Sequence, residues 1–273
     1  MTKEQERARA RRRHQERQKS AKAPVDENTR DKQMFGVILA VILVIAALIV
    51  VPKLIPRSSA SETTSPSSTA TGLQAGQKLA SGCTQPPALQ AKPKSFTKAP
   101  DKATAAGKLW TASVTTNCGK LTFELDGVKA PQTVASFAYL AEQGYWAPSP
   151  CHRVTTEGIF VLQCGDPTGT GSGGPGYTFG IENAPKDGIY PAGTLAMART
   201  QDPNSNGGQF FITYKESELP TDGGGYSIFG KVTSGLDIVE KIAASKALAP
   251  NQADGTPVNP ISILNVEVTE KKS

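Results

Sequence analysis

The sequence predicts a mainly β domain, built as a closed antiparallel barrel or a sandwich, in the C-terminal part of the chain. Short stretches alternate apolar and polar side chains, which is typical of half-buried strands, and Gly-rich connections separate them. Only two stretches show the period of a helix. Many short strands with few helices favour a barrel or sandwich, and about 160 residues are enough to bury one core.

The domain is predicted to begin with a hairpin at Leu109. Residues 110–116 form its first strand and residues 120–125 its second, with Asn117-Cys118-Gly119 as the turn. Apolar and polar side chains alternate along the second strand, as they do when one face is buried. Six further strands are predicted at residues 153–154, 160–163, 194–198, 210–213, 227–232 and 261–269.

Two helices are predicted within the domain. The first runs from Pro131 to Gln143, because proline occupies its first turn, apolar residues recur on one face and Gly144 ends the pattern. The second runs from Leu236 to Ala244. Together these elements predict a folded domain that spans residues 109–270.

An apolar segment near the N-terminus predicts a membrane anchor. Residues 34–51 are 18 consecutive uncharged residues, which is the lower limit for crossing a hydrocarbon core about 30 Å thick. A buried core helix would carry polar side chains on one face. A signal peptide would have a shorter apolar stretch with a cleavage site behind it. We therefore expect one uncleaved transmembrane helix.

The charge distribution predicts the orientation of that helix. Residues 1–33 hold 11 Lys/Arg and 6 Asp/Glu, whereas the rest of the chain holds 19 and 18. The positive-inside rule places this basic tail in the cytoplasm and the domain outside the plasma membrane, with a single pass between them. The run from Arg7 to Arg17 could also be a nucleic-acid arm. The nearly neutral domain, however, lacks the charge of a nucleic-acid-binding face, so we expect no nucleic-acid partner.

Residues 52–108 are predicted to be a disordered linker. Between Ser58 and Thr71, 10 of 14 residues are Ser or Thr, and Pro, Lys and Ala dominate residues 86–108. A segment of this composition buries too little apolar surface to offset the entropy of ordering it.

The chain has four cysteines, at positions 83, 118, 151 and 164. An even number in an extracytoplasmic domain predicts two disulfides, and four cysteines allow three connectivities. None of them has C-x-x-C spacing, and the chain has two histidines. We therefore expect no structural zinc site and no other metal or cofactor.

One motif in the domain matches a nucleotide-binding pattern by spacing alone. Residues 169–174 (GTGSGG) satisfy G-x-G-x-x-G, but a dinucleotide site requires a helix directly after that turn. Here Pro175 and Gly176 follow, so we interpret the segment as a loop. A serine-hydrolase triad cannot be assembled around His152, the one histidine of the domain.

A series of short motifs between Cys151 and Gly230 resembles the cyclophilin pattern. In family order and near family spacing, the chain has H-R-V at 152–154, F-V-L-Q-C-G-D at 160–166, L-A-M-A at 195–198, N-G-G-Q-F-F-I-T at 206–213 and F-G-K-V at 229–232. The run that begins L-Q-C-G-D is similar to the membrane-anchored actinobacterial cyclophilins. The resemblance covers residues 109–270. It implies an eight-stranded antiparallel barrel capped by two helices, acting as a peptidyl-prolyl cis-trans isomerase on Pro-containing polypeptides.

The resemblance implies Arg153 and Gln163 as catalytic residues. An X-Pro bond rotates behind a barrier of roughly 20 kcal/mol that amide resonance sets. The Arg153 guanidinium would donate toward the prolyl nitrogen and carbonyl and so stabilise the twisted amide. Gln163 would hydrogen-bond the substrate backbone. This chemistry needs neither a covalent step nor a cofactor.

The substrate-binding residues that the resemblance implies divide into an apolar pocket for the proline ring and a groove for the preceding residues. The pocket is assigned to Phe160, Val161, Phe211 and Leu219, and the groove to Ala198, Gln209 and the backbone of Arg199, with Tyr226 where family members often have His. His152 precedes Arg153 and so faces the other side of the strand. We expect it to be structural.

The chain departs from the family pattern at several positions. The loop between Arg153 and Phe160 is two residues longer, and Val161 replaces the usual Met, which shrinks the pocket. Family members often have Trp near Leu219, and the segment up to Tyr226 is longer here. Without that Trp we expect at most weak cyclosporin binding, with catalysis retained.

The resemblance also implies the disulfide pairing. It places Cys151 and Cys164 on adjacent antiparallel strands, where a cross-strand bridge is geometrically plausible. Cys83 would then pair with Cys118 and fasten the end of the linker to the first hairpin.

Two functions follow from these features. The first is an isomerase that assists protein folding outside the cytoplasm. The second is a non-catalytic module or scaffold that grips Pro-containing segments of a partner. The retained Arg153 favours the enzyme, because binding requires the pocket but not a donor to the amide nitrogen.

Overall fold

The computed structural model describes residues 79–248 and 251–272. The predicted tail, the predicted transmembrane helix and the first part of the predicted linker lie outside these ranges. Within the two described ranges, no helix combines the length and the apolar character that a membrane span requires.

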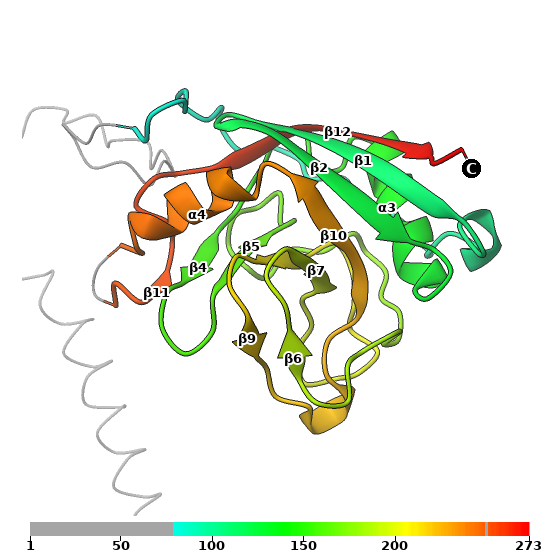
Figure 1. Cartoon of the computed structure of the whole chain (residues 1–273). Helices are drawn as coiled ribbons and strands as arrows, with labels where there is room; N and C mark the ends of the chain where they lie inside the picture. The colour runs from blue at the N-terminus through cyan, green and yellow to red at the C-terminus, as the bar shows by residue number, and fades with distance from the viewer. Residues whose placement is uncertain (1–78, 249–250, 273) are drawn as a thin grey trace, which may run out of the picture. The chain divides into compact units, whose positions relative to one another are not determined.

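One antiparallel sheet of ten strands is the scaffold of the described domain, in the order β11-β4-β5-β8-β7-β10-β2-β1-β12-β3 (Figure 1). The resemblance implied eight strands, whereas this curled sheet has ten, of which β3 and β11 have two residues each. The strands of this sheet are β1 (Leu109–Thr116), β2 (Gly119–Asp126), β3 (Ser149–Pro150), β4 (Arg153–Thr155), β5 (Val161–Cys164), β7 (Thr194–Met197), β8 (Phe210–Thr213), β10 (Ile228–Ser234), β11 (Asp254–Gly255) and β12 (Ser262–Glu270). A separate two-stranded sheet pairs β6 (Ile189–Tyr190) with β9 (Ser217–Glu218).

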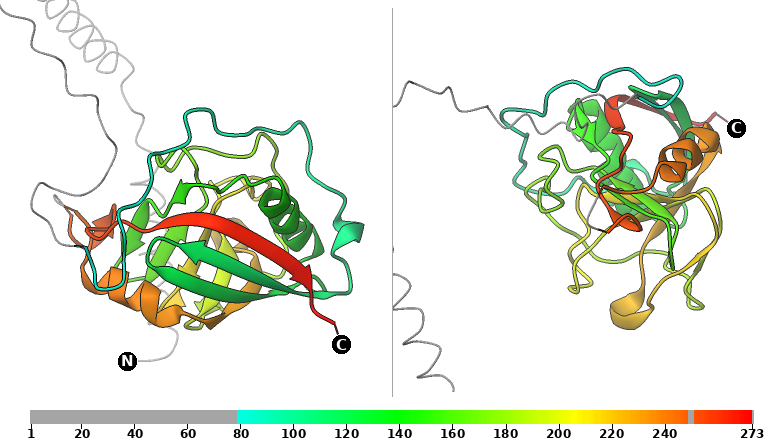
Figure 2. Two further views of the ribbon diagram at one scale, coloured as in Figure 1. Left: turned by 90° about the horizontal axis from the view of Figure 1, so that it is seen from above. Right: turned by 90° about the vertical axis from the view of Figure 1, so that its left-hand side faces the viewer.

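The large sheet curls because the same two chain segments supply both of its ends. β3 and β4 follow each other in one segment, and β11 and β12 follow each other in the other. Between them the Cys151 N–H donates a hydrogen bond to the Ile261 carbonyl over 2.9 Å. The first and last strands of the sheet order are thereby tied together, and Figure 2 shows the resulting curled sheet from two sides.

The inner face of the curled sheet forms the main core. In β2, residues 121, 123 and 125 are buried and the residues between them are half-buried, as a strand with one buried face requires. Aromatic rings fill the centre of this core at centroid distances of 4.6 to 6.5 Å in tilted or edge-on geometry, which aromatic pairs prefer. The rings are those of Phe123, Phe137, Trp146, Phe210 and Phe229.

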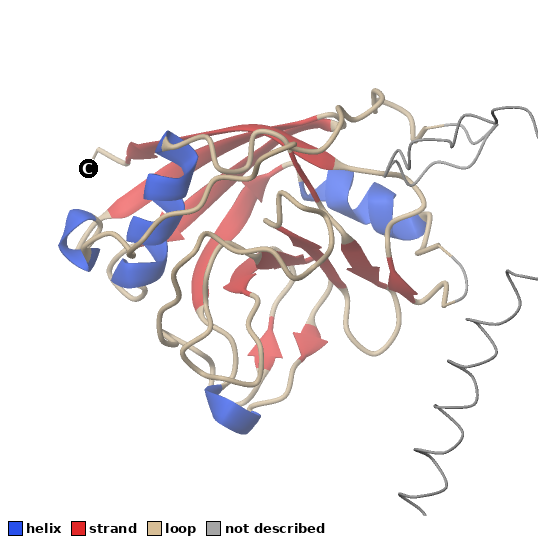
Figure 3. Ribbon diagram, turned by 180° about the vertical axis from the view of Figure 1, so that it is seen from behind, coloured by secondary structure: helices blue, strands red, loops and turns tan. Residues whose placement is uncertain are grey.

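The two α-helices found among the described residues are α3 (Pro131–Glu142) and α4 (Leu236–Ala244), which confirms both predicted helices. Figures 1 and 3 show them at opposite ends of the domain. The first turn of α3 lacks a side-chain cap of its own. A residue far along the chain satisfies its free N–H groups: the Glu182 carboxylate accepts from the backbone N–H groups of Gln132 (3.0 Å) and Thr133 (2.8 Å). Two short 3₁₀-helices, η2 (Lys102–Thr104) and η3 (Asp222–Gly224), complete the described helices.

Residues 79–108 pack on the domain, although their composition predicted a linker. The Gln90 side chain donates to the Tyr145 and Pro148 carbonyls (2.8 and 2.9 Å). The Phe96 ring packs edge-on against Tyr139 at 5.1 Å, and Figure 2 shows the segment (cyan) running along the outside of the domain. Composition does not predict this packing, because the segment has no periodic apolar face. A few side chains and its extended backbone hold it instead.

Both predicted disulfides are present. Cys83 bonds to Cys118 across 35 residues, and Cys151 bonds to Cys164 across 13 residues. The first bridge fastens the packed N-terminal segment to the turn between β1 and β2. The second joins the entry to β4 to the end of β5.

Candidate active site

Three neighbouring strands bring the two predicted catalytic residues and one predicted substrate-binding residue into one row. Arg153 of β4 stands opposite Gln163 of β5, and Gln163 stands opposite Phe211 of β8. Residues directly opposite in antiparallel strands project from the same face. The alternate residues of these strands, among them Val154 and Leu162, are buried in the main core. Arg153, Gln163 and Phe211 therefore share the face that points away from that core.

Polar side chains on this face form a hydrogen-bonded chain. Arg153 Nη1 contacts Gln163 Oε1 at 3.4 Å, and Gln163 Nε2 donates to Gln209 Oε1 over 3.0 Å. Gln209 Nε2 in turn donates to the carbonyls of Gly171 (3.0 Å) and Gly173 (2.8 Å). Because each amide is held on both sides, Gln163 and Gln209 present fixed donors and acceptors beside the guanidinium.

Asp254 was absent from the predicted site, yet it holds Arg153. Arg153 Nε donates to Asp254 Oδ1 over 2.7 Å, and Nη2 donates to Oδ2 over 2.8 Å. These charge-assisted bonds lower the pKa of Asp254 and raise that of Arg153. No sequence signal identifies this pair, because the two residues are 101 positions apart and Asp254 lies in a two-residue strand without periodicity.

An apolar cluster lies next to the row and is separate from the main core. We call it the pocket cluster, and its buried members are Val161, Tyr190, Ala196, Phe211 and Leu219. Ala198 and Tyr226 pack against it and are partly buried. The structure thus brings together the residues predicted for the proline pocket and its rim, with the exception of Phe160.

Phe160 lies on the other side of the sheet. It packs against the main core, and its ring meets that of Tyr214 at 5.9 Å. Consecutive residues of an extended chain point to opposite faces. Since Val161 projects into the pocket cluster, its neighbour Phe160 projects away from it.

Tyr190 is a member of the pocket cluster, although no sequence motif predicted it. Its hydroxyl accepts a hydrogen bond from the Tyr226 N–H (2.8 Å) and donates to the Tyr226 carbonyl (3.0 Å). Its ring lies 6.2 Å from that of Phe211, and the Tyr226 ring lies 5.7 Å from Phe211. Burial raises the pKa of Tyr190, so the hydroxyl keeps its proton and Tyr226 is held at the pocket rim.

A polar groove of about 720 Å³ continues from the row. Gln163, Gln209, Ala198 and Arg199 line it together with residues 171–178. The Arg199 side chain binds other parts of the protein. Its Nε donates to the Gly225 carbonyl over 2.6 Å, and its guanidinium lies 4.9 Å from the Tyr226 ring centre. Arg199 therefore ties the groove to the segment that carries Tyr226.

The loop with the G-x-G-x-x-G spacing folds around the Asp166 carboxylate. That carboxylate accepts from the N–H groups of Gly171 (2.7 Å) and Gly173 (3.0 Å), and from both the N–H and the hydroxyl of Thr168. Burial acts to raise the pKa of Asp166, but these hydrogen bonds together hold it below its usual value. Gly173 has to be glycine, because a Cβ there would come within 2.1 Å of Asp166 Oδ1. The loop aims the Gly171 and Gly173 carbonyls at Gln209.

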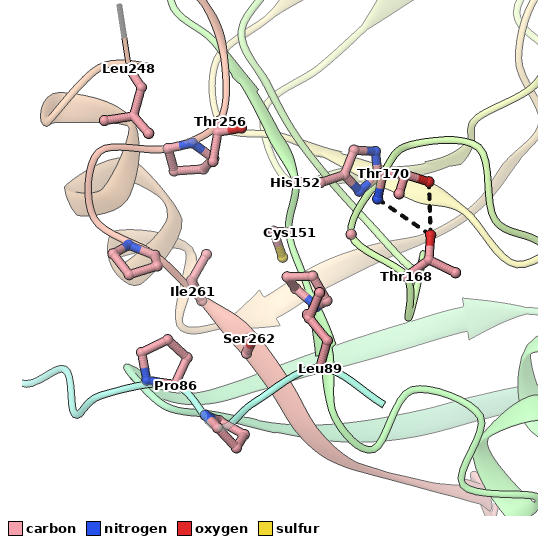
Figure 4. Close-up of a pocket in the computed structure, with 15 residues that line it drawn as sticks. Pro86, Leu89, Cys151, His152, Thr168, Thr170, Leu248, Thr256, Ile261 and Ser262 are labelled. Atoms are coloured by element: carbon pink, nitrogen blue, oxygen red, sulfur yellow. Dashed lines mark hydrogen bonds between the residues drawn. The ribbon is translucent and has the colours of Figure 1, made fainter. Parts of the chain in front are cut away.

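His152 faces away from the row, as predicted. Burial lowers the pKa of its imidazole, and neither ring nitrogen has a hydrogen-bond partner among the described residues. His152 lines a second cavity of about 370 Å³, shown in Figure 4, together with Leu89, Cys151, Thr170 and Ile261. This cavity includes neither Arg153 nor the pocket cluster, so it is distinct from the candidate active site.

This fold, with an arginine beside a small apolar cluster and a polar groove, defines a class of protein. The model of the family "Cyclophilin type peptidyl-prolyl cis-trans isomerase" matches residues 111–268. The chain belongs to this family of enzymes and has the cyclophilin fold.

Relatives of the chain are also named as peptidyl-prolyl cis-trans isomerases. The chain is 39% identical over 209 residues to the probable peptidyl-prolyl cis-trans isomerase B of Mycobacterium leprae, covering 70% of this chain and 68% of that protein. It is 42% identical over 167 residues to the protein of that name from Mycobacterium tuberculosis, covering 56% of this chain and 53% of that protein. The match therefore spans only about half of the second relative.

A solved structure supports the fold assignment. It is a cyclophilin-type isomerase of Cryptosporidium parvum in the presence of the dipeptide Ala-Pro, with 33% identity and a TM-score of 0.50. The match covers 59% of this chain and 99% of that one.

Proposed function

We propose that this enzyme accelerates X-Pro isomerisation with Arg153 as the catalytic donor and the pocket cluster as the proline site. The observation that carries the proposal is the row in which Arg153, Gln163 and Phe211 stand opposite one another on adjacent strands. The barrier of roughly 20 kcal/mol is the loss of amide resonance in the twisted bond. A guanidinium that donates to the prolyl nitrogen as it becomes pyramidal stabilises the transition state more than the ground state.

The substrate is a Pro-containing polypeptide. Its proline ring contacts Phe211, Val161 and Leu219, and the residues before proline lie along the polar groove, where Gln163, Gln209 and the Arg199 backbone hydrogen-bond them. Support for this comes from the Cryptosporidium parvum relative, whose structure was determined in the presence of Ala-Pro. Because Leu219 stands near the position where family members often have Trp, we expect cyclosporin to bind weakly.

Replacing Arg153 tests the catalytic role. We expect Arg153→Ala to lower kcat/KM by about 10²–10³, the size of effect seen when one preorganised transition-state donor is lost, with the fold intact. The measurement is a protease-coupled isomerisation assay with a Pro-containing peptide on the full chain. Lys231→Ala is the matched control, because it removes a cation on β10 that pairs with Glu124 on β2 and lies outside the row and the pocket cluster. Full activity in Arg153→Ala would contradict the catalytic role of Arg153, and no acceleration by the wild type would favour a non-catalytic Pro-peptide module.

We also propose the full organisation of the chain: a cytoplasmic tail, a transmembrane helix at residues 34–51, a linker and an extracytoplasmic isomerase domain. Two disulfides within the domain support the outer location, since disulfides persist in oxidising compartments. The uncharged run behind a basic tail supports the orientation.

The test of this topology is to add protease to cells that have lost their outer envelope layers but keep a sealed plasma membrane. The domain should be digested while a tag at the N-terminus stays protected. Protection of the domain, or release of the whole chain from washed membranes, would contradict the proposed topology.

A further inference from the structure

The contact between Arg153 and Asp254 places a carboxylate within the active site. Asp254 belongs to β11, which pairs with β4 and sets Asp254 opposite Thr155. The Ala253 carbonyl also accepts from the Thr156 N–H over 2.8 Å. Backbone bonds on the same two segments therefore fix Asp254 relative to the strand that carries Arg153.

The pair contributes little to the stability of the fold. The side chains of Arg153 and Asp254 remain 39% and 41% exposed, and ion pairs with that exposure are largely screened by solvent. The contact is bidentate, with both distances below 2.9 Å. What the contact does determine is the orientation of the guanidinium plane.

Asp254 does not occupy the Nη1 group of the Arg153 guanidinium. Asp254 takes the edge formed by Nε and Nη2, whereas Nη1 lies toward Gln163 at 3.4 Å. The carboxylate and Gln163 thus hold the planar group from two sides. An arginine without such a partner distributes over many rotamers, and only some of these would direct Nη1 at the substrate.

We propose that Asp254 is a positioning residue for the isomerisation, holding Arg153 so that its Nη1 edge faces the bound X-Pro amide. The proposal rests on the catalytic role of Arg153 proposed above. Asp254 does not contact the substrate. Its effect is therefore on kcat, through the fraction of Arg153 that is correctly oriented, and the proline pocket that governs binding is left unchanged.

The experiment measures kcat and KM separately for the full chain and its Asp254 variants. Asp254→Ala should lower kcat by about tenfold, as expected when one held rotamer becomes several, with KM within twofold of wild type. Asp254→Glu keeps the carboxylate and should recover most of that loss. Glu270→Ala is the matched control: it breaks the similarly exposed ion pair with Lys108, far from the site, and should leave kcat unchanged.

A double-mutant cycle separates this proposal from the role of Arg153 itself. In an Arg153→Ala background, Asp254→Ala should have no further effect on the residual rate, because Asp254 acts through the guanidinium. If Arg153→Ala alone keeps full activity, the catalytic role of Arg153 fails. If Arg153→Ala is impaired while Asp254→Ala keeps the wild-type kcat or exceeds it, the positioning role of Asp254 is overturned. An equal loss from Asp254→Ala in both backgrounds overturns it as well, since it would reflect a general structural effect.

Discussion

The individual residues of the site act through fixed partners. Arg153 is held by a carboxylate and an amide, Gln163 by Gln209, and Gln209 by two backbone carbonyls. Isomerisation makes no covalent bond, so catalysis depends on dipoles that are already aimed at the place where charge and geometry change. A chain of paired polar groups is a direct way to aim them.

Tyr190 shows how a buried residue supports the rim of the pocket. We predict that Tyr190→Phe lowers the free energy of unfolding by about 1–3 kcal/mol, because the Tyr226 N–H then loses its hydrogen-bond acceptor. Urea denaturation, followed by fluorescence, measures this change in the free energy of unfolding. Tyr139→Phe is the control, since the Tyr139 hydroxyl makes no hydrogen bond to the described residues. Equal stability of wild type and Tyr190→Phe would show that water replaces the bond.

Among the elements, β4 and β5 carry the proposed catalytic residues Arg153 and Gln163 and are short. β4 has three residues and β5 has four, so their few backbone hydrogen bonds alone would hold them loosely. The Cys151–Cys164 disulfide closes the connection between them immediately beside Arg153 and Gln163. It therefore stabilises the part of the sheet on which the site depends.

Removing that bridge should destabilise the domain. We predict that the double variant Cys151→Ala, Cys164→Ala unfolds with a free energy about 3 kcal/mol lower, from the chain entropy that a loop of this length regains when it is opened. Chemical denaturation under non-reducing conditions, with the Cys83–Cys118 bridge intact, measures the difference. Unchanged stability would mean that the loop stays ordered without the covalent link.

For the molecule as a whole, the half-buried His152, whose two ring nitrogens are buried, makes stability depend on pH. Burial lowers its pKa in the folded state, so the unfolded chain binds a proton more readily, beginning near its usual pKa of about 6.5. The stability that neutral His152 provides is complete above that pH and is lost as the pH falls below it. We predict a decrease in unfolding free energy between pH 7 and pH 5.

His152→Phe tests the assignment, because the apolar ring cannot take up a proton. In this variant the decrease between pH 7 and pH 5 should be smaller, as measured by urea denaturation at both values. The carboxylates with lowered pKa values are Glu124, Asp166 and Asp254. Their contribution to stability is lost mainly below pH 5, because the usual pKa of a carboxyl group is about 4. An identical slope in the variant and the wild type would assign the pH dependence to other groups.

The sequence alone predicted most of the fold. Strands with a buried face and helices with an apolar stripe are local patterns, and β1, β2, β12, α3 and α4 formed within two residues of their predicted ends. The resemblance in motif order predicted both disulfides, which are present, and pointed to Arg153, Gln163, Val161 and Phe211, which the fold brings close together. The two-residue strands β3, β6, β9 and β11 had no detectable period, because two residues cannot display an alternation.

The folded chain alone revealed the partners of those residues. Asp254 meets Arg153 across 101 positions, Tyr190 meets Tyr226 across 36, and residues 79–108 pack on the domain through side chains that no pattern marks. Local periodicity records which face of an element is buried. It does not record which distant segment covers that face, since this depends on how the sheet curls and which strand ends it brings together.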